Sequence, residues 1–88
     1  EIPSLMHMGK CFAKRGMNDM AAGTLQKALD RKEIMDDEKM DLHYQLGCVL
    51  DSMDRTEESI EQFKLIYERD IGYRDVADRV DAYYASLG

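Results

Sequence analysis

Two segments of this chain resemble each other at an offset of 38 residues. Residues 5–12 align with residues 43–50, which places Gly9 on Gly47. The alignment continues at the same offset, where Ala21, Leu25 and Ala28 align with Ser59, Phe63 and Ile66. Self-similarity at a period of this length is typical of stacked supersecondary repeats, each too small to bury its apolar face alone. We therefore expect a repeat architecture in which Gly9 and Gly47 allow paired helices to approach closely.

Apolar residues recur at helical spacing along almost the whole chain, which predicts five helices. The apolar stripes, from the first helix to the last, are Leu5, Met8 and Phe12; Ala21, Ala22, Leu25, Ala28 and Leu29; Met40, Tyr44, Leu46, Gly47, Val49 and Leu50; Ile60, Phe63, Ile66 and Tyr67; and Val76, Val80, Tyr83, Tyr84 and Leu87. Only a few residues separate one stripe from the next. The predicted fold class is therefore all-α, with consecutive helices antiparallel.

Polar residues between the stripes predict where helices begin and end. Asn18 is a suitable N-cap for the second helix, and the third should begin near Asp36. Asp54 and Glu57 have the spacing of a capping box at the start of the fourth helix. Gly72 lies where a left-handed residue would end that helix.

The length and composition predict one domain with one small core. Of 88 residues, 44% are hydrophobic, and the absence of Trp together with a single Pro argues against a β-sandwich. Two cysteines do not make a disulfide framework and fit a reducing compartment, so a cytoplasmic location is favoured. No apolar run approaches the roughly 20 residues that span a bilayer, so we expect no membrane insertion. The chain begins with Glu1 rather than Met, which predicts that it is a piece of a longer protein.

Charge is distributed unevenly along the chain. Residues 1–35 carry six basic and four acidic groups, a net +2, whereas residues 36–88 carry six basic and fourteen acidic groups, a net −8. Together they give the net charge of −6. Such a surface would repel a phosphate backbone, so we expect no nucleic-acid partner.

The aligned segments resemble the tetratricopeptide repeat family. Its pattern of large, small and glycine positions is matched by Leu5, Met8, Gly9, Phe12, Ala21, Leu25 and Ala28 in the first repeat and by Leu46, Gly47, Leu50, Ser59, Phe63 and Ile66 in the second. The chain departs from the pattern because His43 occupies a bulky aromatic position and neither repeat ends in Pro. The offset is also 38 residues rather than about 34, with the extra residues around 36–39.

The resemblance implies a short right-handed α-solenoid. Repeat one would span about residues 2–35, repeat two about residues 40–73, and a capping helix about residues 74–87. In this family the first helix of each pair lines a concave groove that takes an extended or helical peptide. The resemblance thus implies a scaffold for protein–protein interaction that has no catalytic activity.

The residues expected to project into that groove come from three helices: Met6, His7, Lys10, Ala13 and Lys14; Tyr44, Gln45, Cys48 and Asp51; and Asp78, Arg79 and Ala82. The groove would have a basic end, an aromatic middle at Tyr44 and an acidic end. A peptide with opposite charges at its two ends would suit it, and the rigid Tyr44 is the best candidate for a binding hot spot. Lys10 has no accompanying Asn, so a clamp for a C-terminal carboxylate is not expected.

Several alternatives remain open at this point. The groove could be empty or covered by further repeats, the domain could self-associate through an end helix, or it could be a structural segment of a larger enzyme or of a secretion or assembly protein. A Cys11–Cys48 disulfide is also open. Of the possible metal ligands, His7 and Cys48 should face the groove while Cys11 and His43 should pack between repeats, so we expect no metal site. No phosphate-binding loop or nucleophile motif is present, and no cofactor is expected.

Overall fold

The computed structural model describes the backbone of residues 2–88 and the side chains from Ser4 onward. These residues form five helices and no strand: α1 (Ile2–Lys14), α2 (Asn18–Asp30), α3 (Asp37–Ser52), α4 (Thr56–Arg69) and α5 (Val76–Leu87). The prediction of an all-α fold with five helices is therefore confirmed.

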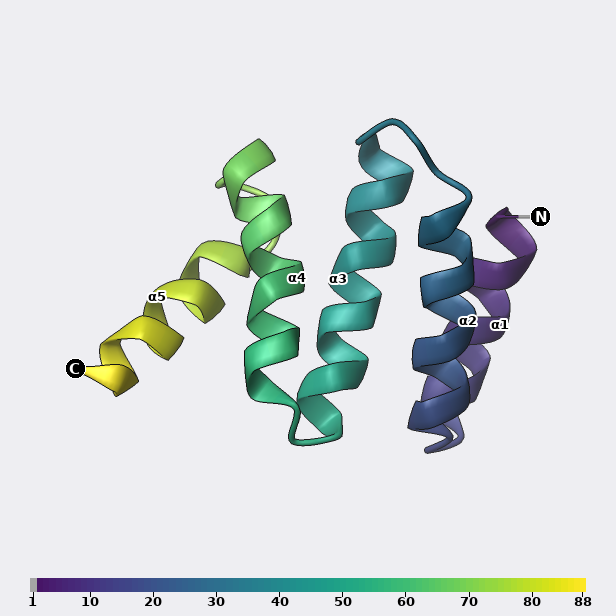
Figure 1. Ribbon diagram of the computed structural model, residues 1–88, viewed down its shortest axis with the longest axis horizontal. Coiled ribbons are helices and arrows are strands. Elements are labelled where there is room, and N and C mark those ends of the chain that lie inside the picture. Colours follow the sequence, from purple (N-terminus) through teal and green to yellow (C-terminus); the bar gives the residue numbers. More distant parts are fainter. Residues whose placement is uncertain (1) are drawn as a thin grey trace.

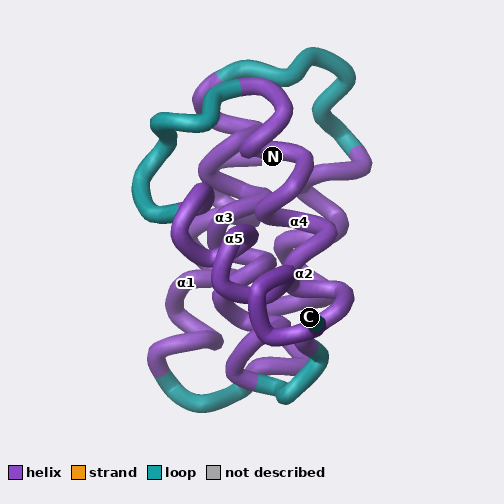
Figure 2. Tube along the Cα trace, turned by 90° about the vertical axis from the view of Figure 1, so that its left-hand side faces the viewer, coloured by secondary structure: helices purple, strands orange, loops and turns teal. Residues whose placement is uncertain are grey.

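The helices stand in a row in chain order (Figure 1), and each packs on the next one along the chain. Beyond these neighbours, α1 also touches α3. The turned view shows the connecting loops at the top and bottom, where the helices end (Figure 2), as expected for successive antiparallel helices. The array measures 40 × 28 × 18 Å. The handedness of the solenoid and the boundaries of the repeats stay predictions.

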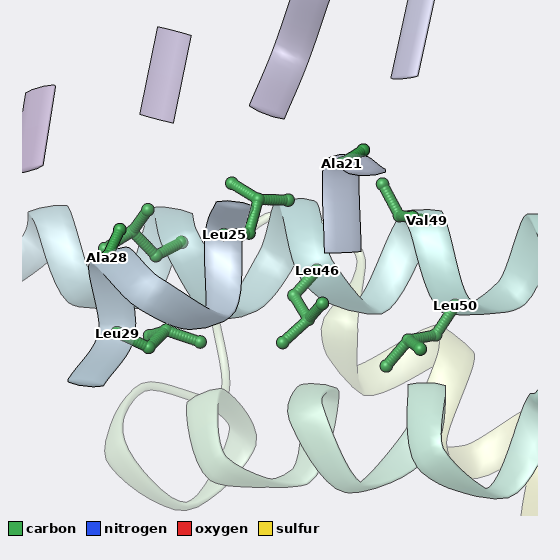
Figure 3. Packing of buried hydrophobic residues seen from close by; sticks show 8 residues of the cluster. Ala21, Leu25, Ala28, Leu29, Leu46, Val49 and Leu50 are labelled. Carbon is green, nitrogen blue, oxygen red and sulfur yellow. The ribbon is translucent and has the colours of Figure 1, made fainter. Parts of the chain in front are cut away.

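The core has two parts. One lies between α2 and α3 (Figure 3) and consists of Ala21, Leu25, Ala28, Leu29, Leu42, Leu46, Val49 and Leu50. The other joins α3, α4 and α5 and consists of Met40, Ile60, Phe63, Ile66, Val76 and Val80. Most of these residues belong to the predicted stripes, because helical spacing brings them onto one face of each helix.

The two glycines of the repeat lie at equivalent helix crossings. A Cβ atom at Gly9 would come within 2.7 Å of the Leu25 side chain, and one at Gly47 would come within 2.7 Å of the Phe63 ring. At the second crossing, the buried Ser59 hydroxyl donates a hydrogen bond to the Gly47 carbonyl over 2.6 Å. The predicted close approach is therefore confirmed at both positions.

The helix starts differ from the prediction at two of three positions. Asp36 does cap α3, because its carboxylate accepts from the Lys39 amide over 2.9 Å. Asn18, however, is already the first residue of α2 and makes no capping bond. Asp54 is not the N-cap of α4: it has φ +60°, and the tight reversal that needs this left-handed residue moves the helix start to Thr56. The predicted capping box is replaced by an Arg55–Glu58 ion pair.

Two further predictions were wrong. Gly72 does not end α4 in a left-handed conformation: the helix ends at Arg69, and the Asp70 carboxylate makes the turn by accepting from the Gly72 amide over 3.1 Å. Met8 is 46% exposed rather than buried. The reason is that α1 is the first described helix of the row, so one flank of α1 has no helix beside it.

Candidate functional site

A surface hollow of about 470 Å³ lies between α1 and α3. Its lining consists of His7, Lys10, Cys11, Ala13, Lys14 and Gln45. His7, Lys10, Cys11 and Lys14 are related by helical spacings of three or four positions, and Ala13 lies beside them, so the lining residues of α1 share one side of the helix. We call this surface the α1/α3 hollow. It brings together five of the residues predicted for the groove and adds Cys11.

The charged side chains of the α1/α3 hollow are Lys10 and Lys14. Lys10 Nζ lies 3.5 Å from the Asp41 carboxylate, and both side chains remain partly accessible to solvent. Lys14 makes no ion pair with any residue that the structure describes. The hollow therefore presents two ammonium groups opposed by a single carboxylate, which favours an anionic ligand.

Cys11 lies in the hollow rather than between the repeats, which corrects the prediction for this residue. It is half-buried, and its Sγ is 3.5 Å from Nε2 of His7. The signal was the spacing itself, since Cys11 follows His7 by one helical turn and Lys10 by one residue. His43 does pack inside: it is 7% exposed, and its Nδ1 lies 2.7 Å from Oε1 of Gln62. Burial lowers the pKa of His43 below its usual 6.5.

Tyr44, the predicted hot spot, is half-buried and engaged within the chain. Its hydroxyl donates to Asp75 over 2.6 Å, and its ring meets the Phe63 ring edge-on with centroids 5.5 Å apart. The guanidinium groups of Arg74 and Arg79 lie 4.9 and 5.8 Å from the centroid of the Tyr44 ring. Burial, with the bond to Asp75, raises the pKa of Tyr44 to about 12.

The surroundings of Tyr44 tie the start of α5 to α3. Arg79 Nε contacts the Asp75 carboxylate over 3.0 Å, and Arg74 reaches Asp41 of α3 over 3.4 Å. A partner that used Tyr44 would have to share these contacts, so the ring and hydroxyl serve first to hold the array together. Cys48 is half-buried beside this cluster, and burial raises the pKa of its thiol.

The predicted acidic end of the groove is divided. Asp51, Arg79 and Ala82 line a second hollow of about 280 Å³ between α3, α4 and α5. Asp78 is exposed on α5 and does not line this hollow. Met6 packs against the first core cluster instead of lining the α1/α3 hollow. The structure thus divides most of the predicted groove residues between two separate hollows and the Tyr44 cluster, and leaves Met6 and Asp78 outside all three.

Sequence reasoning missed Asp41, Gln62 and Asp75, each of which holds a predicted residue in place. Asp75 and Arg79 are one helical turn apart, a spacing that could have indicated their ion pair. The contacts of Asp41 with Lys10 and Arg74 span more than thirty residues and leave no local signal.

Within residues 2–88, no three His, Cys, Asp or Glu side chains gather closely enough to hold a metal ion. Both cysteines are free thiols, which closes the disulfide alternative. Over the same residues, every helix is too short or too polar to cross a bilayer. Comparison with protein-family models, with curated proteins and with solved structures found no match.

Proposed function

We propose that this chain is a non-catalytic protein–protein interaction module that binds an acidic segment of a partner protein in the α1/α3 hollow. The observation that carries the proposal is the hollow itself, because it is open to solvent and its charged lining residues, Lys10 and Lys14, are both basic. Lys10 and Lys14 stand one helical turn apart on the side of α1 that also carries Cys11 and Ala13, so an acidic peptide lying along α1 would meet both ammonium groups.

We further propose that the two helix pairs are tetratricopeptide-type repeats. The support is the pair of equivalent crossings, Gly9 on Leu25 and Gly47 on Phe63, which occur at the same offset as the sequence match. In such repeats the face made by the first helices is the binding face, and here that face contains the α1/α3 hollow.

The proposal predicts a charge preference that a peptide selection can test. Random peptides displayed on phage would be selected against the purified chain, and the enriched sequences would be synthesised with a fluorescent label. Because the hollow is basic on a protein of net charge −6, we expect the enriched peptides to be acidic. Enriched peptides that are neutral or basic would contradict the proposal.

A pair of charge-matched variants then locates the binding surface. Lys10→Glu with Lys14→Glu reverses two charges in the hollow, whereas Lys27→Glu with Arg69→Glu reverses two exposed charges outside it. Measured by fluorescence anisotropy, the affinity for the labelled peptide should fall roughly tenfold or more in the first variant and change little in the second. Equal losses in the two variants would place the peptide elsewhere on the chain, once circular dichroism has shown that both fold.

A further inference from the structure

Cys11 lies in the α1/α3 hollow with a histidine beside its sulfur atom. Its Sγ is 3.5 Å from Nε2 of His7, a distance at which a thiol hydrogen-bonds to nitrogen. The spacing of four residues keeps both side chains on the same side of α1. His7 is exposed and Cys11 is half-buried, so a molecule that enters the hollow from solvent reaches both groups. A neutral imidazole nitrogen is able to accept the thiol proton and leave a thiolate, the form of cysteine that acts as a nucleophile.

The charges around this thiol favour an anionic reactant. Lys10 and Lys14 line the same hollow, and Asp41 of α3 contacts Lys10 over 3.5 Å. Gln45, which α3 contributes to the lining, is uncharged. Two ammonium groups therefore outweigh one carboxylate beside the Cys11 sulfur, and they would raise the local concentration of a reactant that carries carboxylates. The volume of about 470 Å³ is in the range of sites that hold small organic molecules.

The second cysteine has different surroundings. Cys48 packs against the second core cluster, and burial raises the pKa of its thiol. The carboxylates of Asp75 and Asp51 add to this effect, while the Arg79 guanidinium opposes it. A thiol that ionises less readily is the slower nucleophile at neutral pH. The two thiols of the chain should therefore differ in reactivity, and Cys11 should be the faster one.

We propose that Cys11 is a site of reversible oxidation by disulfides that carry carboxylates, such as oxidised glutathione. His7 Nε2 takes the proton from the Cys11 sulfur, and the thiolate attacks one sulfur of the disulfide. A new bond joins the Cys11 sulfur to that sulfur, and the original S–S bond breaks with its electron pair on the second sulfur. The leaving thiolate takes the proton from His7. One thiol and one disulfide thus become a released thiol and a mixed disulfide, so the Cys11 sulfur is oxidised and the leaving sulfur is reduced.

Mapping on the unaltered chain tests the choice of thiol. The protein is treated with oxidised glutathione at neutral pH, the remaining thiols are blocked, and peptide mass spectrometry locates the added group. We expect Cys11 to react about tenfold faster than Cys48, and both to react at similar rates in urea, where the fold no longer protects Cys48. Faster or equal reaction of Cys48 in the folded chain would overturn the proposal. No peptide ligand is present, so the result is independent of the proposed function.

Two coloured disulfides then test the role of the lysines. Dithiobis(nitrobenzoate) carries a carboxylate on each half, whereas dithiodipyridine is uncharged, and each releases an absorbing thiol that gives the rate. In a Cys48→Ala background, Lys10→Gln with Lys14→Gln should lower the rate with the anionic disulfide about fivefold and leave the other rate unchanged. Lys27→Gln with Arg69→Gln, the matched control outside the hollow, should change neither rate.

An equal loss with both disulfides, or no loss with either, would overturn the preference for an anionic reactant. If Cys48→Ala does not fold, the same charge variants are compared by peptide mapping on the chain that retains Cys48.

A third comparison separates proton transfer to His7 from a structural effect. His7→Ala should lower the rate with both disulfides about tenfold at neutral pH, because the thiol loses its proton acceptor. At about pH 9.5, above the value of about 8.5 at which an isolated thiol ionises, hydroxide removes the proton and the variant should react as fast as the parent. A deficit that persists at the higher pH, or no deficit at neutral pH, would overturn the role of His7.

Discussion

Replacing Gly47 by Ala tests whether the close crossing of α3 and α4 holds the second core cluster together. A Cβ atom built at Gly47 lies 2.7, 2.8 and 3.1 Å from three carbons of the Phe63 ring. Ordinary van der Waals contact begins at 3.4 Å, so the ring or the helix must move by about 0.7 Å. Phe63 is only 1% exposed, and its ring is also packed edge-on against Tyr44. The ring is therefore held between Gly47 and Tyr44, with the Arg79 guanidinium 5.0 Å from its centroid, so it cannot yield without disturbing these contacts.

The expected magnitude is the balance of three effects. Overpacking a filled core costs about 1–3 kcal/mol, and the short distances at Gly47 place this variant in the upper part of that range. Moving α3 from α4 would also lengthen the Ser59–Gly47 hydrogen bond, which is worth about 1 kcal/mol. Against these, Ala is favoured over Gly in a helix interior by about 1 kcal/mol. We expect Gly47→Ala to lower the free energy of unfolding by about 2 kcal/mol.

Urea unfolding followed by far-ultraviolet circular dichroism measures this change. Gly23→Ala is the matched control, because Gly23 lies inside α2 and no atom stands within 4 Å of a Cβ built there. Because only helix propensity changes in this control, its free energy of unfolding should rise by about 1 kcal/mol. If Gly47→Ala gains stability as Gly23→Ala does, the reasoning from the crossing distance is refuted.

Two further predictions concern titratable side chains whose pKa is shifted by burial, the half-buried Tyr44 and the buried His43. Tyr44→Phe should cost about 1 kcal/mol at neutral pH through loss of the bond to Asp75. Because the folded pKa of Tyr44 is about 12 against an ordinary 10.0, the parent should lose further stability as the pH rises from 10.0 to about 12, and the variant should lose less. Alkaline urea titrations check this, and equal losses would contradict it. Burial lowers the pKa of His43, so the unfolded chain binds more protons below pH 6.5 and the parent should lose stability there. His43→Leu should flatten this acid slope in the same assay, and an unchanged slope would show that His43 is not its source.

The helices and their buried faces could be predicted because they follow from short-range spacing. Leu25 and Phe63 belong to apolar stripes whose spacing brings the residues onto one side only when the segment is a helix. The repeat alignment also placed them at equivalent positions relative to Gly9 and Gly47. The lining of the α1/α3 hollow was predictable for the same reason. One side of α1 supplies most of it, so helical spacing was enough to group those residues.

The remaining features could not be predicted because they depend on how separate helices and turns are placed in space, which local sequence patterns do not encode. Tyr44 meets Asp75 only because α5 begins beside α3, and that placement is set by the irregular segment after Arg69. Met8 has the spacing of a core residue, yet its burial depends on a neighbouring helix that this flank does not have. At Asp54, the need for a left-handed residue in a short turn prevailed over the capping signal.

The packing of each helix mainly on its neighbours in the chain has a consequence for how the protein folds. Every large interhelical contact joins segments that are adjacent in sequence, so the loops closed during folding are short. Closing short loops costs little chain entropy, and proteins dominated by such local contacts fold in microseconds to milliseconds. Any one of the helix hairpins is able to form first and to serve as the surface on which the next helix assembles. The order of assembly would then follow local hairpin stability and would not require an obligatory long-range nucleus.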